Sequence, residues 1–186
     1  MSSSLGVQAV SRRFGPLTVT IHGQPATLIP DQVWASLAHG PYLSTGVSVE
    51  IVPRGLVREL WRRDQGAKSF PGDYAFRAYT RGNRVVLLSD ATETPESLTW
   101  LLLHELAHVG VNASPYLQRA FRSRKRPAQY MTDDEAHERW PEEQLANHVA
   151  DQLAPHFGSR PGLDRLWWRA RVRRPRRVRQ PLTSSR

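Results

Sequence analysis

The 186-residue sequence predicts an α+β domain with a small, mostly antiparallel sheet packed on two helices. Residues 17–21, 46–52 and 83–89 are rich in β-branched residues or alternate between apolar and polar ones, which is typical of strands. Residues 95–113 and 141–153 each begin at a proline and carry an apolar face, which is typical of helices. The length suits one domain with a core of useful size.

Two hairpins are expected in the sheet. The first pairs residues 17–21 with 25–29 across a His-Gly-Gln turn, and the second pairs 74–79 with 83–89 across a Thr-Arg-Gly turn. Between the hairpins we expect a short helix, a strand and another helix. These are expected at about 30–40, 46–52 and 54–63.

A clear start signal precedes the longest helix. Thr94 supplies a capping hydroxyl, Pro95 suits the first helical position, and Glu96 places an acid near the positive end of the helix dipole. This helix is expected to end near residues 112–114. A basic helix at 115–125 is expected to follow it.

The positive charge of the chain is concentrated at its C-terminus. The net charge is +9, but nine of the 26 basic residues lie in 165–186, where there is no acid, and the remaining 17 balance 17 acidic residues. We expect a flexible lead-in at 1–13, one domain at 14–164 and a disordered Arg-rich tail at 165–186.

The chain contains no cysteine. Disulfides and thiolate metal sites are therefore excluded, and any metal must be held by histidines and carboxylates. The N-terminus lacks a basic region followed by a long apolar run, and no later stretch approaches the length that crosses a bilayer. We therefore expect a soluble, cytoplasmic protein.

The longest helix contains the sequence His104-Glu105-Leu106-Ala107-His108. His104 and His108 are four residues apart, so their imidazoles project from the same face, close enough to bind one Zn²⁺. Glu105 stands beside the first histidine. In such a site this carboxylate is not a ligand but the general base that takes a proton from the attacking water.

The same five residues have a simpler interpretation, as a buried helix whose histidines are satisfied by hydrogen bonds. A chain of this composition contains such a pentad by chance about once in a hundred cases. However, Trp100 and the three leucines before His104 make the helix strongly apolar, and imidazoles without partners are costly to bury there. A metal removes this cost, so the context favours zinc.

A hydrolytic zinc site usually takes three protein ligands, so two histidines need one more partner. We select Glu143, because Ala146 and Ala150 keep its side of the 141–153 helix small enough to approach the first helix closely. Asn147 is expected to hydrogen-bond to a ligand imidazole. The alternatives for the third ligand are Glu142 and, after it, His137 and His148. Both acids also suit a helix N-terminus without any metal.

Two segments resemble the ImmA/IrrE class of gluzincin-type zinc metallopeptidases. They are His104-Glu-Leu-Ala-His108 and Glu143-Gln-Leu-Ala-Asn147, the latter continuing to Pro155. The resemblance spans roughly residues 46–155 and implies a minimal zincin-like fold, in which His104, His108 and Glu143 bind Zn²⁺ and Glu105 acts as general base and acid. Two positions depart from the family pattern, where an aromatic residue and a methionine are usual. These are Val149 and Ala154.

The resemblance also implies an activity, that of a zinc-dependent endopeptidase acting on a protein. In this family the substrate is often a helix-turn-helix transcriptional repressor. The motifs do not identify the residue that stabilises the oxyanion. The candidates are Tyr116, Tyr130, His137 and His148.

The tail suggests a different function. Arginine contacts phosphate well and tryptophan stacks on bases, so the tail is a candidate tether to nucleic acid, the alternative being a solubilising tail. The second functional hypothesis is therefore a nucleic-acid-binding protein with a catalytically inactive zincin-like fold. The candidate contact residues are Trp167, Trp168, Arg169, Arg171, Arg173, Arg174, Arg176, Arg177 and Arg179.

Overall fold

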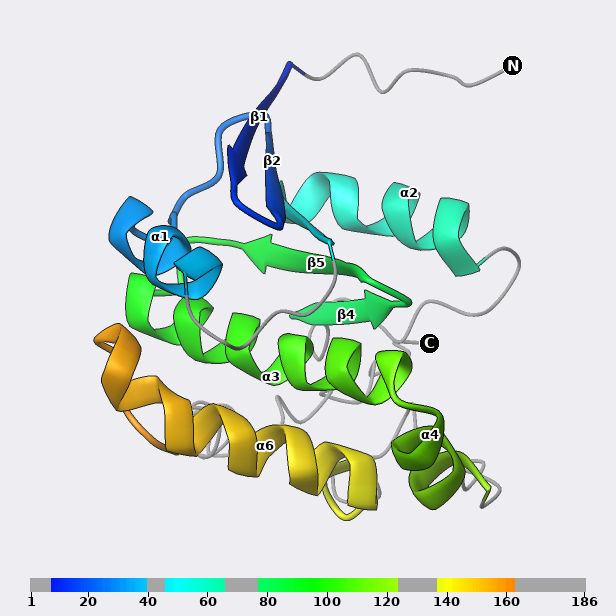
Figure 1. Ribbon diagram of the computed structural model, residues 1–186. Coiled ribbons are helices and arrows are strands. Elements are labelled where there is room, and N and C mark those ends of the chain that lie inside the picture. The colour runs from blue at the N-terminus through cyan, green and yellow to red at the C-terminus, as the bar shows by residue number, and fades with distance from the viewer. Residues whose placement is uncertain (1–7, 40–45, 66–76, 124–136, 163–186) are drawn as a thin grey trace, which may run out of the picture.

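The computed structural model describes residues 8–39, 46–65, 77–123 and 137–162. They form an α+β domain built on a five-stranded sheet of order β1-β2-β3-β5-β4, as Figure 1 shows. The strands are β1 (Ala9–Phe14), β2 (Leu17–His22), β3 (Val47–Pro53), β4 (Ala78–Arg81) and β5 (Arg84–Ser89). The predicted fold class is confirmed.

The sheet is mixed, which corrects the expectation of a mostly antiparallel one. Strands β1–β2 and β4–β5 pair antiparallel, but β2–β3 and β3–β5 pair parallel. Helix α1 (Asp31–His39) connects β2 to β3, and helix α2 (Arg54–Gln65) follows β3 on the way to β4 and β5. These helices act as crossovers, which parallel neighbours require.

The first hairpin lies one strand earlier than expected. Strand β2 pairs with β1, which precedes it, through a turn at Gly15, whose φ is +53°. Residues 9–13 therefore belong to a strand and not to a flexible lead-in. Residues 25–29 form no strand; Thr27 there exchanges hydrogen bonds with Ser89 at the end of β5. A proline at the start of this segment has no N–H to donate to a ladder.

The second hairpin is confirmed, with a later first strand. Residues 74–76 of the expected strand 74–79 lie outside the described residues, and β4 runs from Ala78 to Arg81. Its turn is Gly82-Asn83, with Gly82 at a φ of +62°. This two-residue connection makes β4 the antiparallel neighbour of β5, and β4 is the last strand of the sheet order.

Helices cover both faces of the sheet (Figure 1). Helix α2 packs on one face over a cluster that includes Val57, Leu60 and Val86. Helices α1 and α3 (Pro95–Ala113) pack on the other face, over the larger core. Val49 and Ile51 are two residues apart on β3, so their side chains share a face, and both belong to this larger core.

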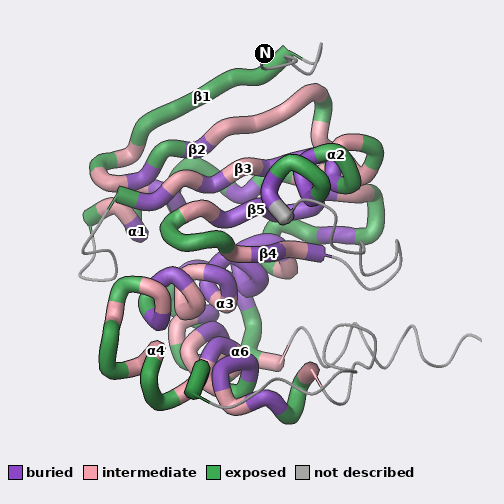
Figure 2. Tube along the Cα trace, turned by 90° about the vertical axis from the view of Figure 1, so that its right-hand side faces the viewer, coloured by how far each residue is buried: buried purple, intermediate pink, exposed green. Residues whose placement is uncertain are grey.

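Helix α3 is buried between the sheet and helix α6 (Pro141–Leu153), as its colouring in Figure 2 shows. Its predicted start is confirmed, because the Thr94 side chain accepts a hydrogen bond from the Ser97 backbone N–H and Pro95 occupies the first turn. Ser114 ends α3 and caps α4 (Pro115–Arg122). Among the described residues, no helix is both long and apolar enough to cross a membrane.

Helix α6 begins and ends where the sequence predicts. A 3-10 turn (Ala154–Phe157) follows the helix directly and ends at Gly158, whose φ is +71°. Asp151 anchors this end of α6 to α3, because its Oδ1 accepts a hydrogen bond of 2.8 Å from the indole N–H of Trp100. With the bond between His108 of α3 and Glu142 at the start of α6, contacts near both ends of α6 hold it along α3.

Candidate metal centre

His104 and His108 lie one turn apart on α3 and turn their rings toward each other. The two Nε2 atoms are 3.2 Å apart, and the ring centroids are separated by 4.9 Å. Both side chains are nearly enclosed, with 12 % and 11 % of their surface exposed. The predicted pairing of the two imidazoles on one helical face is therefore present in the structure.

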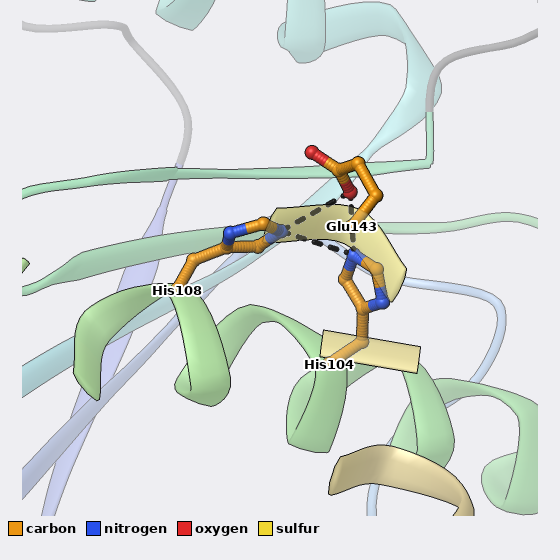
Figure 3. A group of neighbouring side chains, drawn as sticks. All are labelled: His104, His108 and Glu143. Carbon is orange, nitrogen blue, oxygen red and sulfur yellow. Dashed lines mark hydrogen bonds and ion pairs between the residues drawn. The ribbon is translucent and has the colours of Figure 1, made fainter. Parts of the chain in front are cut away.

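Glu143 joins this pair from α6. Its Oε2 lies 3.2 Å from Nε2 of His104 and 3.2 Å from Nε2 of His108, while its other oxygen points away from both rings (Figure 3). Ala146 and Ala150 are fully buried on the same helix, so small side chains allow α6 to approach α3 closely. The structure thus brings together the three residues predicted as ligands.

The three donor atoms have the spacing that a tetrahedral zinc site needs. Zinc binds imidazole nitrogen and carboxylate oxygen at about 2.0–2.1 Å, which separates neighbouring tetrahedral ligands by about 3.3–3.4 Å. All three separations here are 3.2 Å. Two nitrogens, one oxygen and no sulfur form the donor set of hydrolytic zinc sites. The residues present therefore fit a zinc ion.

The outer nitrogens of both rings are also engaged. Nδ1 of His104 lies 2.9 Å from Oδ1 of Asn147, and Nδ1 of His108 lies 3.1 Å from Oε1 of Glu142. Since both partners are acceptors, each ring carries a proton on Nδ1, and in a ring without a second proton the Nε2 lone pair points inward. The predicted contact of Asn147 with one of the two imidazoles is present.

The electrostatics of this cluster favour a cation at its centre. Glu142 and Glu143 are 1 % and 4 % exposed. Burial lowers the pKa of His108, but hydrogen bonds to Glu142 and Glu143 outweigh it and raise that pKa to about 10. Burial raises the pKa of Glu143, but hydrogen bonds from the histidines hold it well below its usual value. The carboxylates thus stay ionised and attract positive charge.

Glu105 is buried beside the two histidines on α3 and is held by the edge strand β4. Thr80 donates a hydrogen bond of 2.7 Å to Oε2 of Glu105, and only 6 % of the glutamate is exposed. Glu105 does not belong to the group of donor atoms formed by His104, His108 and Glu143. A carboxylate near the ligands but outside them has the arrangement expected of a general base.

The alternative ligands take different positions. Glu142 contacts the outer nitrogen of His108, so it lies behind that ring and does not share the central triangle. His137 lies at the margin, with its Nε2 3.4 Å from Oε2 of Glu143. His148 is exposed. Of the other oxyanion candidates, Tyr116 is 77 % exposed and Tyr130 lies outside the described residues.

Three contributors to the centre were not found from the sequence. Thr80 holds Glu105, Trp100 stacks on His104 with ring centroids 5.5 Å apart, and Arg122 donates to Glu142. Trp100 alone left a signal, because it lies four residues before His104 on the same helix. The other two come from elements whose proximity is set by the fold.

Comparison of the chain with protein-family models, with curated proteins and with solved structures finds no match. The resemblance to the ImmA/IrrE class therefore rests on the two motifs themselves. The candidate nucleic-acid contacts, from Trp167 to Arg179, lie outside the described residues, as do residues 163–164 at the end of the predicted domain.

Proposed function

We propose that the protein is a zinc-dependent metallopeptidase. The observation that carries this proposal is the triangle of His104, His108 and Glu143 donor atoms with 3.2 Å sides, whose two imidazoles are oriented from behind by hydrogen bonds. Two lone pairs and a carboxylate oxygen at this spacing repel one another unless a cation or protons separate them. Two observations favour a metal over protons. The three donor atoms have tetrahedral spacing, and the buried Glu105 lies beside them without being one of them.

The chain's own residues supply the proton transfers of peptide hydrolysis. Zinc held by the three ligands would polarise the scissile carbonyl and make water more acidic. Glu105 takes a proton from the attacking water, whose oxygen bonds to the carbonyl carbon. The same carboxyl then gives that proton to the leaving nitrogen as the C–N bond breaks. Thr80 fixes Oε2 of Glu105 by its hydrogen bond, which leaves Oε1 to carry the proton.

The substrate proposed is a protein, and a helix-turn-helix transcriptional repressor is the class that the family resemblance suggests. A cytoplasmic location goes with such a substrate. Of the described oxyanion candidates we favour His137, because it contacts Glu143.

The decisive experiment compares Glu105→Gln with the wild type. Metal content is measured by elemental analysis, and cleavage by mass spectrometry on a peptide library made from a digested proteome. We expect one zinc per chain in both proteins and cleavage only by the wild type. Glu96→Gln makes the same change at an exposed position of α3 and should cleave normally. A wild type without zinc, or a Glu105→Gln variant that cleaves as well as the wild type, would exclude the proposal.

The nucleic-acid hypothesis is kept as a second candidate because residues 165–186 combine nine arginines with no acid. It differs from the first in one measurable outcome. A binding protein with an inactive fold binds DNA in a salt-dependent way and shows no Glu105-dependent cleavage.

A further inference from the structure

A chain of contacts leads from the candidate metal centre to the surface. Glu142 is 1 % exposed, and its Oε1 lies 3.1 Å from Nδ1 of His108. Arg122 of α4 donates to the same oxygen at 2.9 Å and to the amide oxygen of Asn112 on α3. The Arg122 side chain is 38 % exposed, so it is the outermost residue in this series of contacts. Three helices thus meet at one buried carboxylate.

The two histidines are supported in chemically different ways. His104 has a neutral amide behind its outer nitrogen, whereas His108 has a carboxylate. A carboxylate acceptor fixes the ring orientation and also makes the opposite nitrogen a stronger donor to a metal. It performs this role only while it is held in one orientation, and the ion pair with Arg122 helps to hold it there.

We infer that Glu142 and Arg122 are positioning residues for the metal: Glu142 orients His108, and Arg122 holds Glu142 in place. This inference rests on the zinc site of the proposed function. It makes the affinity for metal depend on a surface helix that contributes no ligand, because Arg122 is the last residue of α4.

A purely structural role for the same contacts is the rival interpretation. In that case the Arg122–Glu142 ion pair only fastens α4 to α6, and removing it lowers the stability of the metal-free protein without altering the metal's surroundings. The two roles are separated by the metal affinity of the folded protein and by the visible absorption spectrum of bound Co²⁺, which reports the geometry and donor strength of its ligands.

The experiment uses the full chain and three variants. Arg122→Gln removes the cation, Arg122→Lys keeps the charge but loses the planar fork, and Glu142→Gln keeps the shape but loses the charge. Arg119→Gln is the matched control, because it makes the same change at an exposed position of the same helix. Zinc affinity is measured by competition with a chromogenic chelator, and folding is checked by circular dichroism.

We expect zinc to bind about 10- to 100-fold more weakly to Glu142→Gln and about tenfold more weakly to Arg122→Gln. Arg122→Lys should fall between Arg122→Gln and the wild type, and Arg119→Gln should match the wild type. The visible absorption bands of bound Co²⁺ should shift in Arg122→Gln and in Glu142→Gln. If Glu142→Gln does not fold, Arg122→Gln still decides, since its side chain is partly exposed.

The outcomes also distinguish this inference from the function on which it rests. If the wild type binds no zinc, the proposed function itself is excluded. A wild type that binds zinc, together with variants of equal affinity and an unchanged Co²⁺ spectrum, overturns the inference alone. Equal loss of affinity in Arg119→Gln and Arg122→Gln also overturns it, because the effect then follows from the net charge of α4.

Discussion

His104 and Asn147 are joined by a hydrogen bond of 2.9 Å between the ring Nδ1 and the amide Oδ1, across the interface of α3 and α6. The bond fixes the ring tautomer that offers Nε2 to a metal. It also ties the orientation of a residue in the first motif to a residue in the second. The two motifs are therefore one unit in space, although 43 residues separate these positions.

Removing this amide should weaken the metal site without unfolding the domain. We expect Asn147→Ala to bind zinc about 10- to 100-fold more weakly, because the His104 ring is then free to rotate. Asn147→Asp retains an acceptor and makes it a carboxylate, so it should bind zinc at least as tightly as the wild type. The measurement is chelator competition, and Gln144→Ala, at an exposed position of the same helix, is the control. Equal affinity in Asn147→Ala would show that the bond has no part in binding.

The third ligand can be tested through thermal stability. A ligand that binds only the folded state raises the melting temperature, and the rise grows with its concentration. Zinc should therefore raise the melting temperature of the wild type, and a chelator should reverse the rise. Glu143→Ala should lose most of the rise, because two imidazoles alone hold zinc weakly. Glu59→Ala, exposed on α2, should keep it in full. An undiminished rise in Glu143→Ala would assign the third ligand elsewhere.

Structural features that depend on residues within one or two helical turns were predicted correctly from the sequence. The start of α3 depends on Thr94 and Pro95, which act within one turn, and α6 begins at Pro141 for the same kind of reason. The pairing of His104 and His108 is also local, because helical spacing alone brings them together. Such features need no knowledge of the tertiary fold.

The errors arose where distant segments decide the outcome. Strand β1 is polar and exposed along most of its length, because it lies at the edge of the sheet, and so it carries no alternating pattern. The parallel pairings of β3 depend on which strands the crossover helices bring together. In the site, Glu142 was considered as a ligand but contacts the outer nitrogen of His108 instead, because Arg122 and His108 converge on it from different helices.

Asp90 should contribute to stability only above a low pH. Burial raises its pKa, but hydrogen bonds from Thr92 and Arg54 outweigh this and hold the pKa at about 2, below the ordinary value of 3.8. A carboxyl whose pKa is lower in the folded state stabilises the fold above its unfolded-state pKa. That contribution is lost as the pH falls through the folded-state value.

The difference in free energy of unfolding between the wild type and Asp90→Asn should be constant above about pH 5. It should shrink as the pH falls from about 4 to 2, because Asp90 becomes protonated. Urea unfolding at several pH values measures it. Comparing two proteins cancels the titration of all other groups. A difference that stays constant down to pH 2 would mean that Asp90 has an ordinary pKa.

The arginine-rich tail gives the last prediction, which is independent of the metal. Each arginine that neutralises a phosphate releases counterions from DNA, so binding through the tail should weaken steeply as salt increases. Deleting residues 169–186 removes eight of the nine arginines of 165–186 and should abolish this salt-sensitive binding while zinc content stays unchanged. The probe is a fluorescent DNA duplex titrated at several salt concentrations.

As a control, a variant with the same arginines replaced by lysine keeps the charge and should retain most of the salt dependence. Binding that survives the deletion with the same salt dependence would assign it to the rest of the chain, where basic and acidic residues nearly balance.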